Sequence, residues 1–229
     1  MLLGFTKFEL GKSNDMSRLR RMPPRRSYDQ YCSAARALDT VGDRWTLLIV
    51  RELLAGPRRY TDLHADLPGV STDVLASRLK DMERDGLATR RRLPPPGAAN
   101  VYELTGRGRA LLPVLQALGA WGQAELGERG PTDAIRAHWF ALPLLRALEG
   151  EGLVEVRLDE GHFHLFVGTD EGPVYGHGAA PGEPDALLVM DTATCTAVAQ
   201  GVLSLLDAVR AGRVEVSGEG TLAKGLREA

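Results

Sequence analysis

A predicted helix followed by a hairpin, in the N-terminal half, constrains the fold of this chain most. Leu75, Leu79 and Met82 recur at intervals of four and three residues, which predicts a helix with one apolar face. Ser71 is a favourable N-cap for this helix, and Gly86 ends it. The opposite face carries small and polar side chains. A helix that slim can enter a DNA major groove, which is about 12 Å wide.

The hairpin adds positive charge beside this helix. Residues 87–93 predict a strand that contains three consecutive arginines, residues 94–99 a neutral loop, and residues 101–104 the return strand. Arg90 and Arg92 share one face of such a strand and Arg91 points away, so the three are not expected to touch one ligand together. A helix and hairpin alone fit an ordinary unit with solvated arginines equally well. The residues upstream discriminate between the two readings.

Three shorter helices are expected before Ser71. Residues 28–39 form the first, residues 42–53 the second, and the third begins at Arg58 and reaches Leu67. Pro68-Gly69 makes the turn into the Ser71 helix. Two short helices joined by a tight glycine-containing turn indicate a helix-turn-helix, which makes the following hairpin a wing.

Several sequence motifs in this region resemble those of the HxlR-type winged-helix regulators, a MarR-related group of dimeric bacterial transcription regulators. The resemblance spans roughly residues 30–125. It rests on Cys32, on the runs Leu38-Asp39-Thr40-Val41-Gly42-Asp43-Arg44-Trp45, Gly56-Pro57-Arg58-Arg59-Tyr60 and Tyr102-Glu103-Leu104-Thr105, and on Trp121-Gly122. It implies a winged helix-turn-helix fold, double-stranded DNA as partner and a homodimer.

The expected DNA contacts lie on the recognition helix, at the start of the helix-turn-helix and on the wing. They are Arg58, Arg59, Ser71, Thr72, Asp73, Ser77, Arg78, Lys80, Arg90 and Arg92. For Arg58 and Arg59 at a helix start, phosphate contact is favoured over a solvated turn. Arg78 stays open between an ion pair within the motif and a contact to the DNA backbone.

The segment from Leu111 to Leu126 is expected to form a long helix. Its apolar residues cover more than one narrow stripe, so one face can serve its own core and the other a partner's. Burial within a single chain is the alternative, and the family resemblance favours a dimer interface.

Charge and composition change near residue 130. Lys and Arg outnumber Asp and Glu by 21 to 15 through Gly130, whereas the remaining residues carry 7 against 15. A basic module carrying an acidic one suggests a nucleic-acid-binding domain joined to a different domain. We therefore expect a basic tail over residues 1–27, a winged-helix domain over residues 28–126 and a second domain over residues 131–229.

No apolar run approaches a membrane span, no signal peptide is convincing, and the two cysteines lie far apart. A cytoplasmic protein without membrane partners is expected. The tail carries Arg18, Arg20, Arg21, Arg25 and Arg26. It is interpreted as a solvated tail, with a basic arm along the DNA as the alternative.

The rear domain is expected to be α+β, so the whole chain is assigned to the α+β class. A helix over residues 132–149 is expected first, followed by four strands over residues 153–158, 162–168, 173–177 and 186–190. Two helices then follow, one from Asp191 and one within residues 201–211. A strand over residues 212–218 and a helix over residues 219–226 end the domain. Asp191 to Gly201 and Ala208 to Gly218 weakly resemble the rear of sterol-carrier-protein-type lipid-binding domains. The resemblance implies an apolar cavity and an apolar small-molecule ligand, without identifying any contact residue.

Catalytic chemistry finds little support. No zinc-protease, phosphate-loop or nucleophile-elbow motif is present, so no enzyme and no cofactor is expected. If residues 169–172 form a hairpin loop, His164 pairs with His177 and both lie beside His162. The interpretation favours a polar, solvated sheet face over a metal site, because no ligand-spacing motif supports one.

Cys32 matches the position at which several HxlR-type regulators carry a reactive thiol. An exposed thiol of low pKa can sense oxidants, and Arg36 one turn on could favour the thiolate. The alternative is a small apolar residue that packs the first helix.

These observations predict a homodimeric DNA-binding transcription regulator. Its control would come from an apolar ligand in the rear domain or from oxidation of Cys32. The rival is a small-molecule carrier or sensor whose winged helix mainly dimerises. The operator, the sense of regulation and the signal do not follow from the sequence.

Overall fold

The computed structural model describes residues 27–95, 99–127, 129–169 and 172–228 and divides the chain into two compact units, residues 1–40 and 41–229. The tip of the wing and nearly all of the basic tail lie outside the described residues. In the first unit, α1 (Ser33–Val41) begins five residues later than the sequence predicted. Ser27 Oγ and the backbone N–H of Tyr28 both donate to the carboxylate of Asp39, at 3.1 and 3.0 Å.

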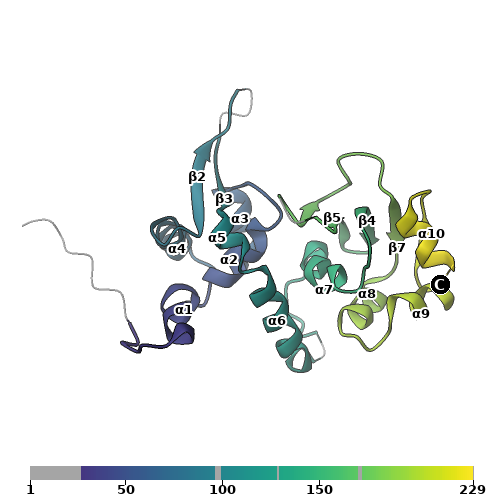
Figure 1. Cartoon of the computed structure of the whole chain (residues 1–229), viewed down its shortest axis with the longest axis horizontal. Coiled ribbons are helices and arrows are strands. Elements are labelled where there is room, and N and C mark those ends of the chain that lie inside the picture. Colours follow the sequence, from purple (N-terminus) through teal and green to yellow (C-terminus); the bar gives the residue numbers. More distant parts are fainter. Residues whose placement is uncertain (1–26, 96–98, 128, 170–171, 229) are drawn as a thin grey trace, which may run out of the picture. The chain divides into compact units, whose positions relative to one another are not determined.

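The second unit opens with the helix-turn-helix. It comprises α2 (Thr46–Leu53), α3 (Tyr60–Asp66) and α4 (Thr72–Arg84), which Figure 1 shows grouped beside the wing. Leu63, Leu75 and Leu79 are fully buried in one apolar cluster, as the helical spacing predicted. Gly69 takes φ +84° in the turn before α4, a backbone conformation that L side chains rarely adopt.

The wing is a three-stranded antiparallel sheet in the order β1-β3-β2. β2 (Ala88–Arg92) and β3 (Asn100–Leu104) are the predicted hairpin. The third strand, β1 (Arg58–Arg59), corrects the prediction that these arginines begin a helix. Their backbone pairs with Tyr102 and Val101 on the edge of β3, so α3 starts only at Tyr60, with Arg59 extended at its N-cap.

The chain leaves the wing through α5 (Gly106–Arg109) into α6 (Leu112–Gly122) and a short 3₁₀ turn, η1 (Gln123–Glu125). Gly108 packs so tightly that a Cβ there would lie 2.0 Å from the carbonyl oxygen of Leu87. This position therefore requires glycine.

The rear half contains a mixed five-stranded sheet in the order β6-β5-β4-β7-β8. Its strands are β4 (Gly152–Leu158), β5 (Gly161–Val167), β6 (Tyr175–His177), β7 (Ala186–Val189) and β8 (Glu215–Ser217). β4 and β7 run parallel and the other pairs antiparallel. The helices α8 (Thr192–Ala199), α9 (Leu205–Arg210) and α10 (Thr221–Glu228) follow β7 and β8, so this half is α+β (Figure 1).

The helix predicted over residues 132–149 does not form as one element. Residues 131–136 are not helical, and η2 (Ala137–Phe140) leads into the short helix α7 (Ala141–Leu145). Pro143 explains the break, because proline cannot donate a helical hydrogen bond and is tolerated only in the first turn. The helix therefore begins just two residues before it.

The histidine pairing predicted in the rear sheet is wrong by one residue. Phe163 lies opposite His177, and His164 lies opposite Gly176. Because side chains alternate across a strand, this shift places His164 and His177 on opposite faces. His164 is buried with its Nδ1 3.2 Å from the carbonyl oxygen of Gly178, whereas His162 is exposed.

The unit from Val41 onward has one continuous apolar core, which joins the helix-turn-helix and wing to the rear sheet. That cluster extends from Val41 to Ala223 and includes Leu54 and Leu115 as well as Phe163 and Tyr175. No helix among the described residues is long and apolar enough to span a bilayer.

Candidate nucleic-acid interface

The exposed face of α4 is polar and narrow. Thr72, Asp73, Ser77 and Lys80 are all exposed, as the helical pattern predicted. Ser71 caps the helix, with its Oγ accepting a 3.3 Å hydrogen bond from the backbone N–H of Val74. The first turn is thus held by its cap while the side chains beyond it stay free for a ligand.

An open pocket of about 340 Å³ adjoins this face. Asp73, Ser77 and Arg78 of α4 line one side, and Asp43 to Trp45 line the other. Arg44 is exposed, with its guanidinium 5.5 Å from the centre of the Trp45 ring. Arg44 was not among the DNA contacts expected from the sequence. The available sequence signal was a basic residue within two positions of the start of α2.

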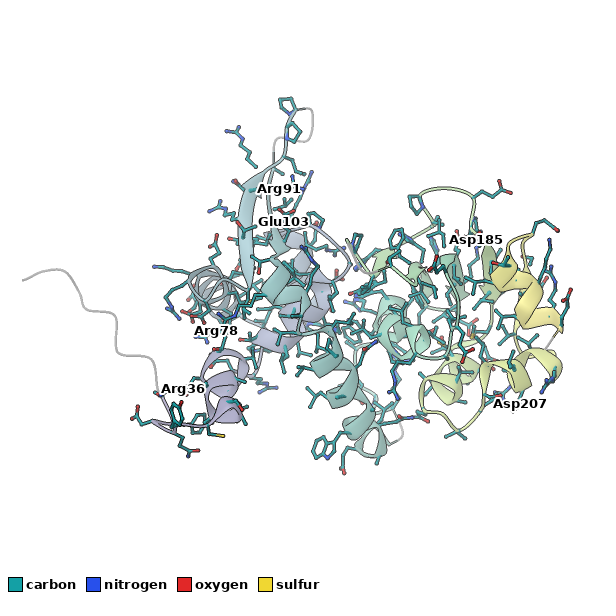
Figure 2. The ribbon with its side chains drawn as sticks, viewed as in Figure 1. Arg36, Arg78, Arg91, Glu103, Asp185 and Asp207 are labelled. Atoms are coloured by element: carbon teal, nitrogen blue, oxygen red, sulfur yellow. The ribbon has the colours of Figure 1, made fainter. Side chains whose placement is uncertain are left out.

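Arg78 takes the first of its two open alternatives. Its guanidinium pairs with Asp43 and, at 2.8 Å, with Asp81, so it ties the start of α2 to α4. Arg78 is labelled beside α4 in Figure 2. Because these two carboxylates compensate its positive charge within the motif, Arg78 is less available to contact a DNA phosphate.

The adjacent arginines of β1 have different surroundings. Arg58 pairs with Asp66 of α3, and its side chain is only 16% exposed. Arg59 is exposed. The two residues were expected to act together, but their alternation along β1 turns one inward and leaves one for a phosphate.

The wing arginines alternate in the same way. Arg91 pairs with Glu103 across the hairpin at 2.7 Å, and both are labelled in Figure 2. Arg90 lies 5.9 Å from the centre of the Tyr102 ring on the other face, and Arg92 is exposed. The expectation that Arg90 and Arg92 share a face, with Arg91 pointing away, agrees with the strand register.

The two cysteines differ in exposure and in the surroundings of their thiols. Cys32 is exposed at the start of α1, and the backbone N–H groups of Ala35 and Ala34 lower the pKa of its thiol. Arg36, expected to favour the thiolate, instead pairs with Asp39 at 3.6 Å. Cys195 is fully buried, and burial raises the pKa of its thiol to about 12.

The slim helix, its flanking cations and the wing define a winged helix-turn-helix of the kind found in transcription regulators. Residues 40–129 match the family described as HxlR-like helix-turn-helix. The chain is 38% identical over 86 residues to the HTH-type transcriptional regulator YvaP of Bacillus subtilis, covering 38% of this chain and 80% of that protein. The chain therefore belongs to the HxlR-like helix-turn-helix family of transcription regulators.

Two further comparisons concern a second Bacillus subtilis regulator, YodB. The chain is 36% identical to it over 85 residues, covering 37% of this chain and 76% of YodB. A solved structure described as the reduced form of YodB matches with 33% identity and a TM-score of 0.38, covering 44% of this chain and 99% of that one. The family match ends at residue 129, so the rear half lies beyond it.

Proposed function

We propose that this transcription regulator binds its operator as a homodimer, with α4 in the major groove and the wing along the backbone. The observation that carries the proposal is the set of exposed polar side chains on one face of α4, which make no hydrogen bond to other described residues and are available for base edges. Thr72, Ser77 and Lys80 are the proposed reading residues. Ser71 and Asp73 flank them at the helix start.

Phosphate contacts are assigned to Arg59, Arg90 and Arg92, with Arg44 added by its position beside the α4 pocket. Arg58 and Arg78, which the sequence included, are assigned to ion pairs within the motif. Phosphate contacts set the register of a protein on the duplex, whereas base contacts set its sequence preference.

The dimer is assigned to α6. Val114, Leu118 and Trp121 are 46%, 45% and 77% exposed and recur at intervals of four and three residues, so they form one apolar stripe. Leu115 faces the core. The helix thus has an inner face that packs its own chain and an outer face that requires another surface.

Oxidation of Cys32 is the proposed signal. An exposed thiol with a lowered pKa has the two properties that favour reaction with oxidants. The apolar-ligand alternative has less support. The described pockets beside Asp73 and Pro173 are not lined by the rear helices, and the inner side chains of the rear sheet are buried. We therefore do not extend the sterol-carrier resemblance to a ligand.

Operator selection with the full chain tests the proposal. Random duplexes should yield a near-palindromic site whose halves lie about 34 Å apart, bound by two chains with strongly salt-dependent affinity. A reduced sample should bind this site and a mildly oxidised sample should not, with Cys32→Ser insensitive to the oxidant. One chain per asymmetric site would overturn the dimer, and an oxidant response retained by Cys32→Ser would overturn the signal.

A further inference from the structure

A cluster of four ionisable side chains lies where the helix-turn-helix meets the rear half, and the spacing of these residues in the sequence gives no sign of it. Glu52 comes from α2, Asp66 from α3, His138 from η2 and His177 from β6. Each offers one nitrogen or carboxylate oxygen, and these four atoms all lie within 4.8 Å of one another. Four elements that are distant in the sequence thus bring four potential metal ligands close together.

Burial makes this arrangement unlike a surface cluster. Glu52 is fully buried and His138 is 7% exposed. Burying a carboxylate costs folding free energy unless its charge is compensated, so Glu52 needs compensating partners. The His138 Nε2 atom lies 2.8 Å from Glu52 Oε2 and supplies one such contact.

The outer oxygen of each carboxylate is already occupied. Glu52 Oε1 accepts from Trp139 Nε1 at 3.0 Å and from Arg51 Nε at 2.8 Å. Asp66 Oδ2 accepts from Arg58. The other oxygens have weaker or cluster-internal partners: Glu52 Oε2 contacts His138, and Asp66 Oδ1 lies 3.8 Å from Arg136 Nε. Such supporting contacts orient carboxylates in the way that residues around metal ligands do.

His177 provides the second observation. Its Nε2 is buried without a hydrogen-bond partner in the described structure, and its ring centre lies 3.9 Å from that of His138. A buried nitrogen left unpaired costs stability that a bound cation would recover.

We propose that Glu52, Asp66, His138 and His177 bind one divalent transition-metal ion, with Zn²⁺ as the best match. Two imidazoles and two carboxylates are hard-to-borderline donors that suit zinc in tetrahedral coordination. The ion would replace the direct His138–Glu52 contact and link α2 and α3 to η2 and β6. The charges of Arg51, Arg58 and Arg136 nearby oppose a cation, so the affinity should be micromolar rather than that of a zinc finger.

The test uses the full chain with any affinity tag removed, stripped with EDTA and dialysed. Titration with ZnCl₂ followed by gel filtration and elemental analysis should retain one Zn²⁺ per chain. Co²⁺ should give the visible absorption of a four-coordinate site. Saturating Zn²⁺ should raise the Tm by several degrees, because an ion that binds only the folded state stabilises it.

Two variants and a matched control decide the assignment. His177→Phe keeps a stacked ring and Asp66→Asn keeps the volume, and each should lose the bound Zn²⁺, the Co²⁺ spectrum and the Tm shift. His162→Ala removes an exposed histidine of the adjacent strand β5 and should keep all three. Circular dichroism of the metal-free variants separates lost binding from lost folding.

Three results would overturn the proposal. The first is that the unaltered chain retains no metal. The second is that His162→Ala loses as much metal as the two test variants. The third is that Zn²⁺ leaves the Tm of the unaltered chain unchanged and that both variants, when folded, bind as much metal as the unaltered chain. In each case the cluster would be a metal-free polar contact. Operator binding by the EDTA-treated chain at constant salt is measured in parallel, so failure of the metal site remains separate from failure of DNA binding.

Discussion

At the scale of single residues, the sequence predicted which side chains are charged but not which charges are free. Arg58 and Arg59 are chemically identical neighbours, yet the first is held by Asp66 and the second is exposed. Asp66 lies eight residues beyond Arg58, and nothing in that spacing marks the pair. Arg78 is likewise paired with Asp43, 35 residues earlier. Such assignments require the tertiary structure.

This difference gives a paired prediction. Arg59→Ala should weaken binding to all DNA sequences and flatten the dependence of log K on log salt by about one unit for one lost phosphate contact. Arg58→Ala should leave that slope unchanged and lower the unfolding free energy, since the mostly buried Asp66 loses the nearer of its two ion-pair partners. Fluorescence anisotropy at several salt concentrations and urea unfolding measure the two effects. Equal slopes for the two variants would contradict the assignment.

The thiols give a second prediction at this scale. Iodoacetamide should alkylate Cys32 in the native protein and leave Cys195 unmodified, because only the first is exposed. The thiolate is the reacting form, so the rate at Cys32 should rise with pH and level off above a midpoint below that of an ordinary thiol. Mass spectrometry over a pH series gives the midpoint. Cys195 should react only in urea, and an ordinary midpoint at Cys32 would contradict the lowered pKa.

At the scale of elements, periodicity located α4, the hairpin and most rear strands, because these carry a clear apolar period. Periodicity gave wrong predictions at two places, a helix interrupted by a proline and the pairing of two strands. Pro143 divides the predicted helix of residues 132–149, although the apolar spacing continues on both sides of it. The pairing of β5 with β6 was wrong by one residue, since strand positions alone do not fix a register.

The recognition helix carries a prediction about base preference. Ser77→Ala and Lys80→Ala should each shift the preferred bases, with a loss of discrimination of up to about 1–3 kcal/mol per productive contact. Selection of sites from a random duplex library measures this. Glu83→Ala, near the C-terminal end of the same helix, is the control and should keep the original site. Unchanged preferences in both test variants would move base reading to another element.

The cap of this helix gives a separate expectation. Ser71→Ala removes the acceptor for the N–H of Val74 and should lower stability by about 1 kcal/mol. Ser71→Asp should retain the cap but add negative charge at the DNA surface. Urea unfolding should thus show a lower stability for Ser71→Ala than for the unaltered chain. Fluorescence anisotropy should show a weaker affinity for DNA in Ser71→Asp.

At the scale of the whole molecule, the sequence predicted two modules from their opposite charge. That the two modules are separate domains remains a prediction. The contacts near Glu52 show why charge composition alone does not decide whether the two modules are separate. His138 and Trp139, from beyond residue 130, donate to or contact a carboxylate buried in α2, and Tyr175 donates to the carbonyl oxygen of Arg51 at 2.8 Å. Charge counts carry no information about such pairings.

The assembly prediction concerns the exposed stripe on α6. Leu118→Glu with Trp121→Glu should convert a dimer to a monomer, because two carboxylates would face an apolar partner surface. Light scattering measures the mass, and operator affinity should fall because the two half-sites are no longer joined. Leu126→Glu, outside the helix, serves as the control. A double variant that stays dimeric would place the interface elsewhere.

The buried carboxylate of Glu52 also bears on how the chain is made. Its partners His138 and Trp139 follow 86 and 87 residues later, and synthesis at roughly 5–20 residues per second needs about 4–17 s to add them. Throughout that interval the carboxylate of Glu52 has its neighbour Arg51 but lacks these two later partners. The DNA-binding half of a growing chain should therefore reach its final packing only after the rear half has left the ribosome.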